Sequence, residues 1–241
     1  MDFSFSDQRS KSLSHILAHI LSSLILVARN FLFLIISPYK TMRRIAKETD
    51  FGQLVIIFCL AVAYFYYAQT VRQRAFHPLL ASPSIAASLG MFGVTFILIT
   101  KFFYYVSQRM SIMDGADEHA KGNKTYKANK ANVSIQYKPF VFTFAYSLLP
   151  TFIWFYATST LYYLLPPPRT TSFLGKGFSM VFIVFSVSLL LWRIVLLYLS
   201  IRFSTKASFY RIALSMALFT LWFLPYCYAM YKLEIFRIPF I

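Results

Sequence analysis

Two long stretches of this chain contain no carboxylate, and that absence constrains its fold more than any other feature. They run from residue 51 to 113 and from 119 to 233, and all eight Asp and Glu residues lie outside them. Of the 241 residues, 58% are hydrophobic and only 13% are charged, whereas a soluble domain is about 25% charged. This distribution predicts a polytopic membrane protein.

Five apolar segments are long enough to cross a bilayer, for which a helix needs about 20 residues. They are residues 52–70, 85–106, 139–165, 178–201 and 209–231. The polar segment 107–138 separates the second from the third, and we expect it to be a solvated cytosolic loop. The sequence therefore predicts an all-α transmembrane domain over residues 51–241, with five spans in a helical bundle.

The N-terminal segment, residues 1–50, has a different pattern. Apolar residues recur along one helical face of residues 14–36. The opposite face carries His15, His19, Ser22, Arg29 and Asn30. An apolar stripe with a polar back favours an amphipathic helix lying in the membrane interface, with a sixth crossing as the alternative. After Pro38 comes a short basic segment that includes Arg43 and Arg44.

The basic residues predict the orientation. Most of the 24 Lys and Arg residues fall on the side of the N-terminal segment, which places the N-terminus in the cytosol and the C-terminus outside. We interpret the net charge of +16 as attraction to anionic lipid headgroups on the cytosolic face, not as a signal for nucleic acid. The expected location is a bacterial inner membrane, with the ER/Golgi or the mitochondrial inner membrane as alternatives.

Arg193 is the most informative candidate for a functional site. It lies about 13–15 Å below the cytosolic end of its span at 1.5 Å per residue, where a charge costs at least about 2.5–3.5 kcal/mol. One interpretation is contact with a lipid phosphate, a freed carbonyl or an acid of a partner chain. The other is snorkelling toward the cytosolic headgroups, with Trp192 beside it.

Prolines and small residues mark three further positions. Pro150 and Pro225 interrupt apolar segments, and Pro150 leaves the carbonyl of Tyr146 without its helical donor. Two interpretations are open for each kink: it helps to bind a lipid or partner, or it serves only the packing of the helices. Ala86 and Gly90 are four residues apart and form a small face that allows close approach of another helix, within the chain or from a partner.

No pattern of a catalytic or metal site is present, so we expect neither an enzyme nor a cofactor. His15 and His19 lie one helical turn apart without a third ligand nearby. None of the five predicted spans contains Asp, Glu or His, which weighs against ion-coupled transport because coupling needs a group that binds the ion.

The order of parts resembles the Yip1-domain family of five-span membrane proteins. Its elements here read ISPYKTMRRIAKETDFGQLVIIF, then KPFVFTFAYSLLPTFIW, then SLLLWRIVLLYLSIRFSTKASFYRIAL. The resemblance implies five helices and a cytosolic N-terminus. Eukaryotic members work in ER–Golgi traffic and contact Rab GTPases. The short N-terminal segment of this chain is more similar to that of the bacterial members.

Three functions are compatible with these features. The first is a membrane scaffold or adaptor that binds lipid, a membrane protein partner or a second copy through its kinked helices, Arg193 and its basic face. A permease or lipid transporter without ion coupling, using a cavity beside Pro150 and Pro225, is the second. The third is an accessory subunit of a large membrane complex.

Overall fold

Every regular element that the structure describes is an α-helix. The computed structural model describes residues 3–48, 50–76, 85–120, 137–164, 173–205 and 207–232. Its helices are α1 (Phe3–Ile36), α2 (Pro38–Ile45), α3 (Phe51–Phe76), α4 (Ile85–Ala120), α6 (Tyr137–Ser147), α7 (Leu149–Leu164), α8 (Phe173–Thr205) and α9 (Phe209–Lys232). The prediction of an all-α bundle is confirmed.

Six helical stretches in these residues are long and apolar enough to cross a membrane. They are Ala18–Ile36, Phe51–Val71, Ile85–Arg109, Tyr137–Leu161, Gly175–Thr205 and Phe209–Met230. The last five coincide with the five predicted spans. The first falls in the N-terminal segment, so length and composition alone admit a sixth crossing.

The third predicted span forms the centre of the bundle. Most of Tyr137–Leu161 is buried, whereas each of the other five stretches is largely exposed on its outer side. In this centre Phe140, Phe142, Phe144 and Tyr146 are almost completely buried. Such exposure is expected where lipid tails cover the outside and packing of side chains holds the helices together.

This central span is broken, as the position of Pro150 predicts. Helix α6 ends at Ser147 and α7 begins at Leu149, because proline has no N–H to donate and its ring displaces the preceding turn. At the break, the Leu148 N–H donates to the Ala145 carbonyl at 3.2 Å. Pro225, by contrast, lies inside the continuous helix α9.

The loop predicted for residues 107–138 is wrong in its first part. Helix α4 continues to Ala120, and residues 121–136 lie outside the described part of the chain. The polar residues after 106 do mark a change of environment, but Arg, Met, Ala and Glu among them have good helix propensity. Polarity alone therefore does not end a helix that leaves the membrane.

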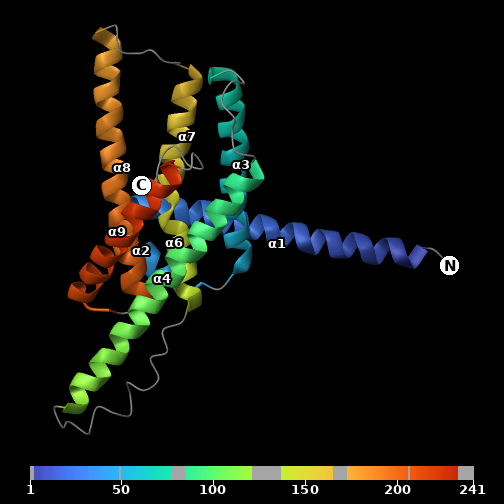
Figure 1. Ribbon diagram of the computed structural model, residues 1–241. Helices are drawn as coiled ribbons and strands as arrows, with labels where there is room; N and C mark the ends of the chain where they lie inside the picture. Colours follow the sequence, from blue (N-terminus) through green and yellow to red (C-terminus); the bar gives the residue numbers. More distant parts are fainter. Residues whose placement is uncertain are drawn as a thin grey trace.

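Helix α1 runs across α3, α7 and α8 instead of alongside them (Figure 1). It bonds the start of α3, where Ser23 bonds Asp50, just before that helix, and Asn30 bonds Gln53 in its first turn. The following helix α2 packs on the last turns of α8, with the rings of Tyr39 and Phe203 4.9 Å apart. Together α1 and α2 pack across α3, α6 and α8, and we call this pair the platform.

A glycine allows this crossing. A methyl group added at Gly52 would lie 2.5 Å from Ser23 Oγ and 3.1 Å from Ser23 Cβ. The same group at Gly90 would meet no atom within 4 Å. Helices α1 and α3 thus approach closely only because Gly52 has no side chain.

We predict that Gly52→Ala destabilises the fold by about 1–3 kcal/mol, since overpacking forces neighbouring atoms to move. Gly90→Ala is the matched control, because its methyl group enters open space. Thermal unfolding of both variants in detergent, followed by circular dichroism, measures the difference. Equal unfolding temperatures for the two variants would contradict the close contact between α1 and α3.

Candidate functional site

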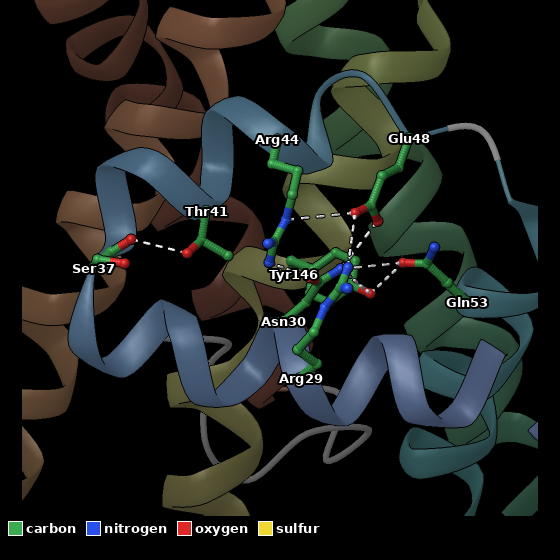
Figure 2. Close-up of polar contacts among 8 residues, drawn as sticks. All are labelled: Arg29, Asn30, Ser37, Thr41, Arg44, Glu48, Gln53 and Tyr146. Carbon is green, nitrogen blue, oxygen red and sulfur yellow. Dashed lines mark hydrogen bonds and ion pairs between the residues drawn. The ribbon is translucent and has the colours of Figure 1, made fainter. Parts of the chain in front are cut away.

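A cluster of buried and partly buried polar side chains joins the platform to the bundle (Figure 2). We call it the polar cluster, and its members are Asn30 of α1, Arg44 of α2, Glu48, Gln53 of α3 and Tyr146 of α6. The side chains of Asn30, Gln53 and Tyr146 are almost completely buried. One cluster therefore ties three consecutive helices to α6, which is distant in sequence.

Asn30 is the centre of this cluster. Its Nδ2 donates to Glu48 Oε2 at 3.0 Å and to the Tyr146 hydroxyl at 3.2 Å. Its Oδ1 accepts a bond of 2.8 Å from Arg44 Nη2. The Tyr146 hydroxyl in turn donates to Gln53 Oε1. Both ends of the buried amide are satisfied, as a polar group away from water requires.

The charged edge of the cluster is only partly buried. Glu48 Oε1 lies 4.0 Å from Arg29 Nη2 and 3.8 Å from Arg44 Nε. The side chains of Arg29 and Arg44 are 44% and 42% exposed. Exposed charges are costly in contact with acyl chains, so this edge belongs at the level of water or lipid headgroups.

Asp50 caps the first turn of α3 and fixes α1 to it. Its carboxylate accepts a bond of 2.7 Å from Ser23 Oγ and one of 2.9 Å from the Gly52 N–H. Burial raises the pKa of Asp50, but these hydrogen bonds outweigh it and hold the pKa below its ordinary value. An ionised carboxylate at this position also suits the positive end of the helix dipole.

The length of α3 relates the polar cluster to the bilayer. Its apolar stretch begins at Phe51, next to the cluster, and has 21 residues. At 1.5 Å per residue that is about 31 Å, which matches the hydrocarbon thickness of about 30 Å. The cluster therefore lies at one end of an apolar stretch that is long enough to cross the bilayer.

The second polar feature is a groove between α7 and α8. It has a volume of about 200 Å³. Its lining residues are Pro150, Thr151, Trp154, Ser186, Val187, Leu189, Leu190 and Arg193, and we call it the Arg193 groove. At its far end Trp154 Nε1 donates to Ser186 Oγ at 2.9 Å, which leaves that end without a free indole donor.

Arg193 lies at the other end of the groove with few partners. Its guanidinium donates to the Thr151 hydroxyl, and among the described residues no carboxylate pairs with it. A guanidinium has five N–H donors. Most of its capacity is therefore not used by the described part of the chain.

Arg193 lies nine residues before Arg202 on the continuous helix α8, and it also lies close to the polar cluster. Its partner Thr151 follows Tyr146 by five residues, about 8 Å along the helix, so Arg193 lies about that far above the polar cluster. The sequence prediction of 13–15 Å counted from Arg202. Helices α6 and α8 extend past the cluster, however, where Ser200 bonds Thr143 at 2.8 Å.

The other predicted site residues lie apart from this groove. Arg43 is exposed on the outer side of α2. Trp192 packs against the apolar core and does not line the groove. Pro225 is exposed on α9.

The small-residue face has no partner within the described chain. Ala86 and Gly90 are exposed on α4, and Gly90 has open space beside it. Packing of this face against a helix of the same chain is thus not observed, and its use by a second chain stays a prediction.

Sequence reasoning missed several residues of the two polar features. It assigned Asn30 to the water-facing side of residues 14–36, which is wrong, because Asn30 is buried against α3 and α6. It did not single out Gln53, Glu48 or Trp154. A signal was present for Asn30: Ser23, Val27, Asn30 and Leu34 recur on one helical face, and all four are buried.

Comparison of the chain with family models, with curated proteins and with solved structures found no match. The fold shows an integral membrane protein with several candidate spans. The resemblance to the Yip1-domain family stays an expectation drawn from short motifs.

We predict that Tyr146→Phe destabilises the protein by about 1–3 kcal/mol, because it leaves buried amide groups of Gln53 and Asn30 short of a partner. Tyr67→Phe is the control, since the Tyr67 hydroxyl bonds Thr160 at an exposed site. Thermal unfolding in detergent compares the two variants. A Tyr146→Phe protein as stable as the control would show that the cluster contributes little to the docking of α1.

Proposed function

We propose that the protein is a non-enzymatic membrane scaffold of the Yip1-like type, whose platform lies on the anionic cytosolic leaflet. The observation that carries this proposal is the docking of α1 across the bundle through the polar cluster. On this reading α1 lies in the interface, and the remaining five long apolar helices cross the membrane.

The three faces of α1 support an interfacial position. One face, with Ser23, Val27, Asn30 and Leu34, is buried against the bundle. A second, exposed face is apolar and includes Leu21, Leu24, Ile25, Leu32 and Ile35. A third carries His19, Ser22 and Arg29, all exposed. An outer surface divided into an apolar and a polar half suits a helix between acyl chains and water.

Helix α2 adds a cationic surface next to α1. Its own residues Thr41, Met42 and Ile45 are buried on the side that faces the bundle. Lys40 and Arg43 are exposed on its outer side, and Lys47 is exposed two residues after its end. Each such cation contributes about 1 kcal/mol of attraction to an anionic leaflet. The platform therefore has the chemistry to recruit acidic lipids around the protein.

Two neighbouring cysteines test the position of α1. In a protein without Cys59 and Cys227, we expect Ser22→Cys to react with a membrane-impermeant maleimide in proteoliposomes and Leu21→Cys to be protected. The reason is that the two side chains occupy different faces at the same point of the helix. If α1 crosses the bilayer, both positions lie at one depth and react alike, which would contradict the interfacial platform.

The cations of α2 test the scaffold function itself. We expect spin-labelled phosphatidylglycerol to associate with the protein more strongly than spin-labelled phosphatidylcholine, with a preference that falls as salt rises. Replacing Lys40, Arg43 and Lys47 by Gln should abolish most of that preference. Lys176→Gln with Lys232→Gln is the control, at exposed cations of other helices. An unchanged preference in the triple variant would overturn the proposal.

A further inference from the structure

We propose that the Arg193 groove binds one anionic phospholipid, with the phosphate on the Arg193 guanidinium and one acyl chain between α7 and α8. This site is distinct from the cations of α2. It rests on the proposed function only in assigning the platform to the cytosolic leaflet.

The first argument is the unbalanced charge. Arg193 has no acidic partner among the described residues, and its one hydrogen bond goes to a neutral hydroxyl. A charge in an apolar environment is stable only when it is paired and hydrogen-bonded. A phosphate matches the guanidinium best, because its oxygens accept two parallel N–H bonds at once.

The second argument is the shape of the groove. Between Arg193 and Ser186 the walls are apolar apart from Thr151, with Leu189, Leu190 and Pro150 among them. A volume of about 200 Å³ is below the 300–1,000 Å³ of sites that enclose a whole small ligand. The groove therefore accommodates part of a molecule whose remainder stays in the bilayer.

The groove is also open toward the surrounding lipid. Val187 lines it and is 50% exposed on the outer surface of α8. The next outward residues, Leu191 and Ile194, are likewise exposed. An acyl chain can enter from the side without any opening of the bundle.

The third argument is depth. Arg193 bonds Thr151, which follows Tyr146 of the polar cluster by five residues, so it lies on the order of 8 Å above the cluster. A lipid phosphate belongs near that end of the apolar stretch, and an arginine side chain covers much of such a distance by snorkelling. From Arg193 to Ser186 the groove then rises about 10 Å into the apolar layer. Head and tail of a phospholipid thus fit the two ends of the groove in the correct order.

The experiment is native mass spectrometry of the full chain released from nanodiscs of phosphatidylcholine and phosphatidylglycerol in equal amounts. We expect one retained phosphatidylglycerol per chain, and at least a tenfold loss of this species in Arg193→Gln. Leu190→Trp keeps the cation but fills the groove, and it should cause a similar loss. This second variant keeps the test decisive if Arg193→Gln does not fold.

Arg202→Gln is the matched control, because Arg202 is an exposed cation on the same helix. It should leave the retained lipid unchanged, and millimolar inorganic phosphate should not displace it. Equal retention in Arg193→Gln, an equal loss in Arg202→Gln, or retention of phosphatidylcholine as readily as phosphatidylglycerol would each overturn the proposal. Displacement by free phosphate would overturn it as well, because the acyl chain would then contribute nothing.

The two proposals fail separately. Gln at Lys40, Arg43 and Lys47 should lower the general preference for acidic lipid but keep the single retained molecule. Arg193→Gln should keep the general preference for acidic lipid but lose the single retained molecule. Loss of both properties in either variant would show that the groove is not a site of its own.

Discussion

The amide of Asn30 is the constraint on which the arrangement of this protein depends. Each buried polar atom without a partner costs about 1–3 kcal/mol. Asn30 finds its partners in Arg44, Glu48 and Tyr146, with Gln53 in reach of the same nitrogen. A single side chain therefore holds α1, α2, α3 and α6 in one geometry.

Hydropathy could not have revealed this arrangement. The stretch Ala18–Ile36 has 19 residues and a mean hydropathy of 2.0, which is as apolar as several of the other five. What distinguishes it is the direction in which its few polar residues point. Ser23 and Asn30 face the first turn of α3, and Arg29 faces Glu48. Direction depends on the neighbouring helices, and in the sequence it is visible only as the recurrence of Ser23, Val27, Asn30 and Leu34 on one helical face.

Features that depend on local chemistry were predictable. The five apolar segments followed from the absence of carboxylates, and the break in the central span followed from Pro150. Features that depend on contacts between distant segments were not. One example is the lining of the groove, where Trp154 donates a hydrogen bond to Ser186, thirty-two positions away. The nearness of Arg193 to the polar cluster was not predictable, because it depends on the docking of α1, which a count from Arg202 does not include.

The same contrast applies to the ends of helices. Residues 107–120 are polar, and polarity was read as a loop, yet α4 continues through them. Leaving the membrane changes which side chains are stable on a helix, but the backbone hydrogen bonds remain equally good in water. Helix termini therefore need their own signals, such as the cap that Asp50 provides for α3.

The platform also resolves a mismatch between hydrophobic lengths. The apolar stretch of α3 has 21 residues and that of α8 has 31, so the two differ by about 15 Å. A bilayer normally meets an overlong helix by thickening or by letting it tilt. Here Leu196, Leu199 and Ile201 on the surplus turns of α8 are buried in the protein, with α2 packed against that helix. Helix α2 takes the place of acyl chains there, so one membrane thickness serves both sides of the molecule.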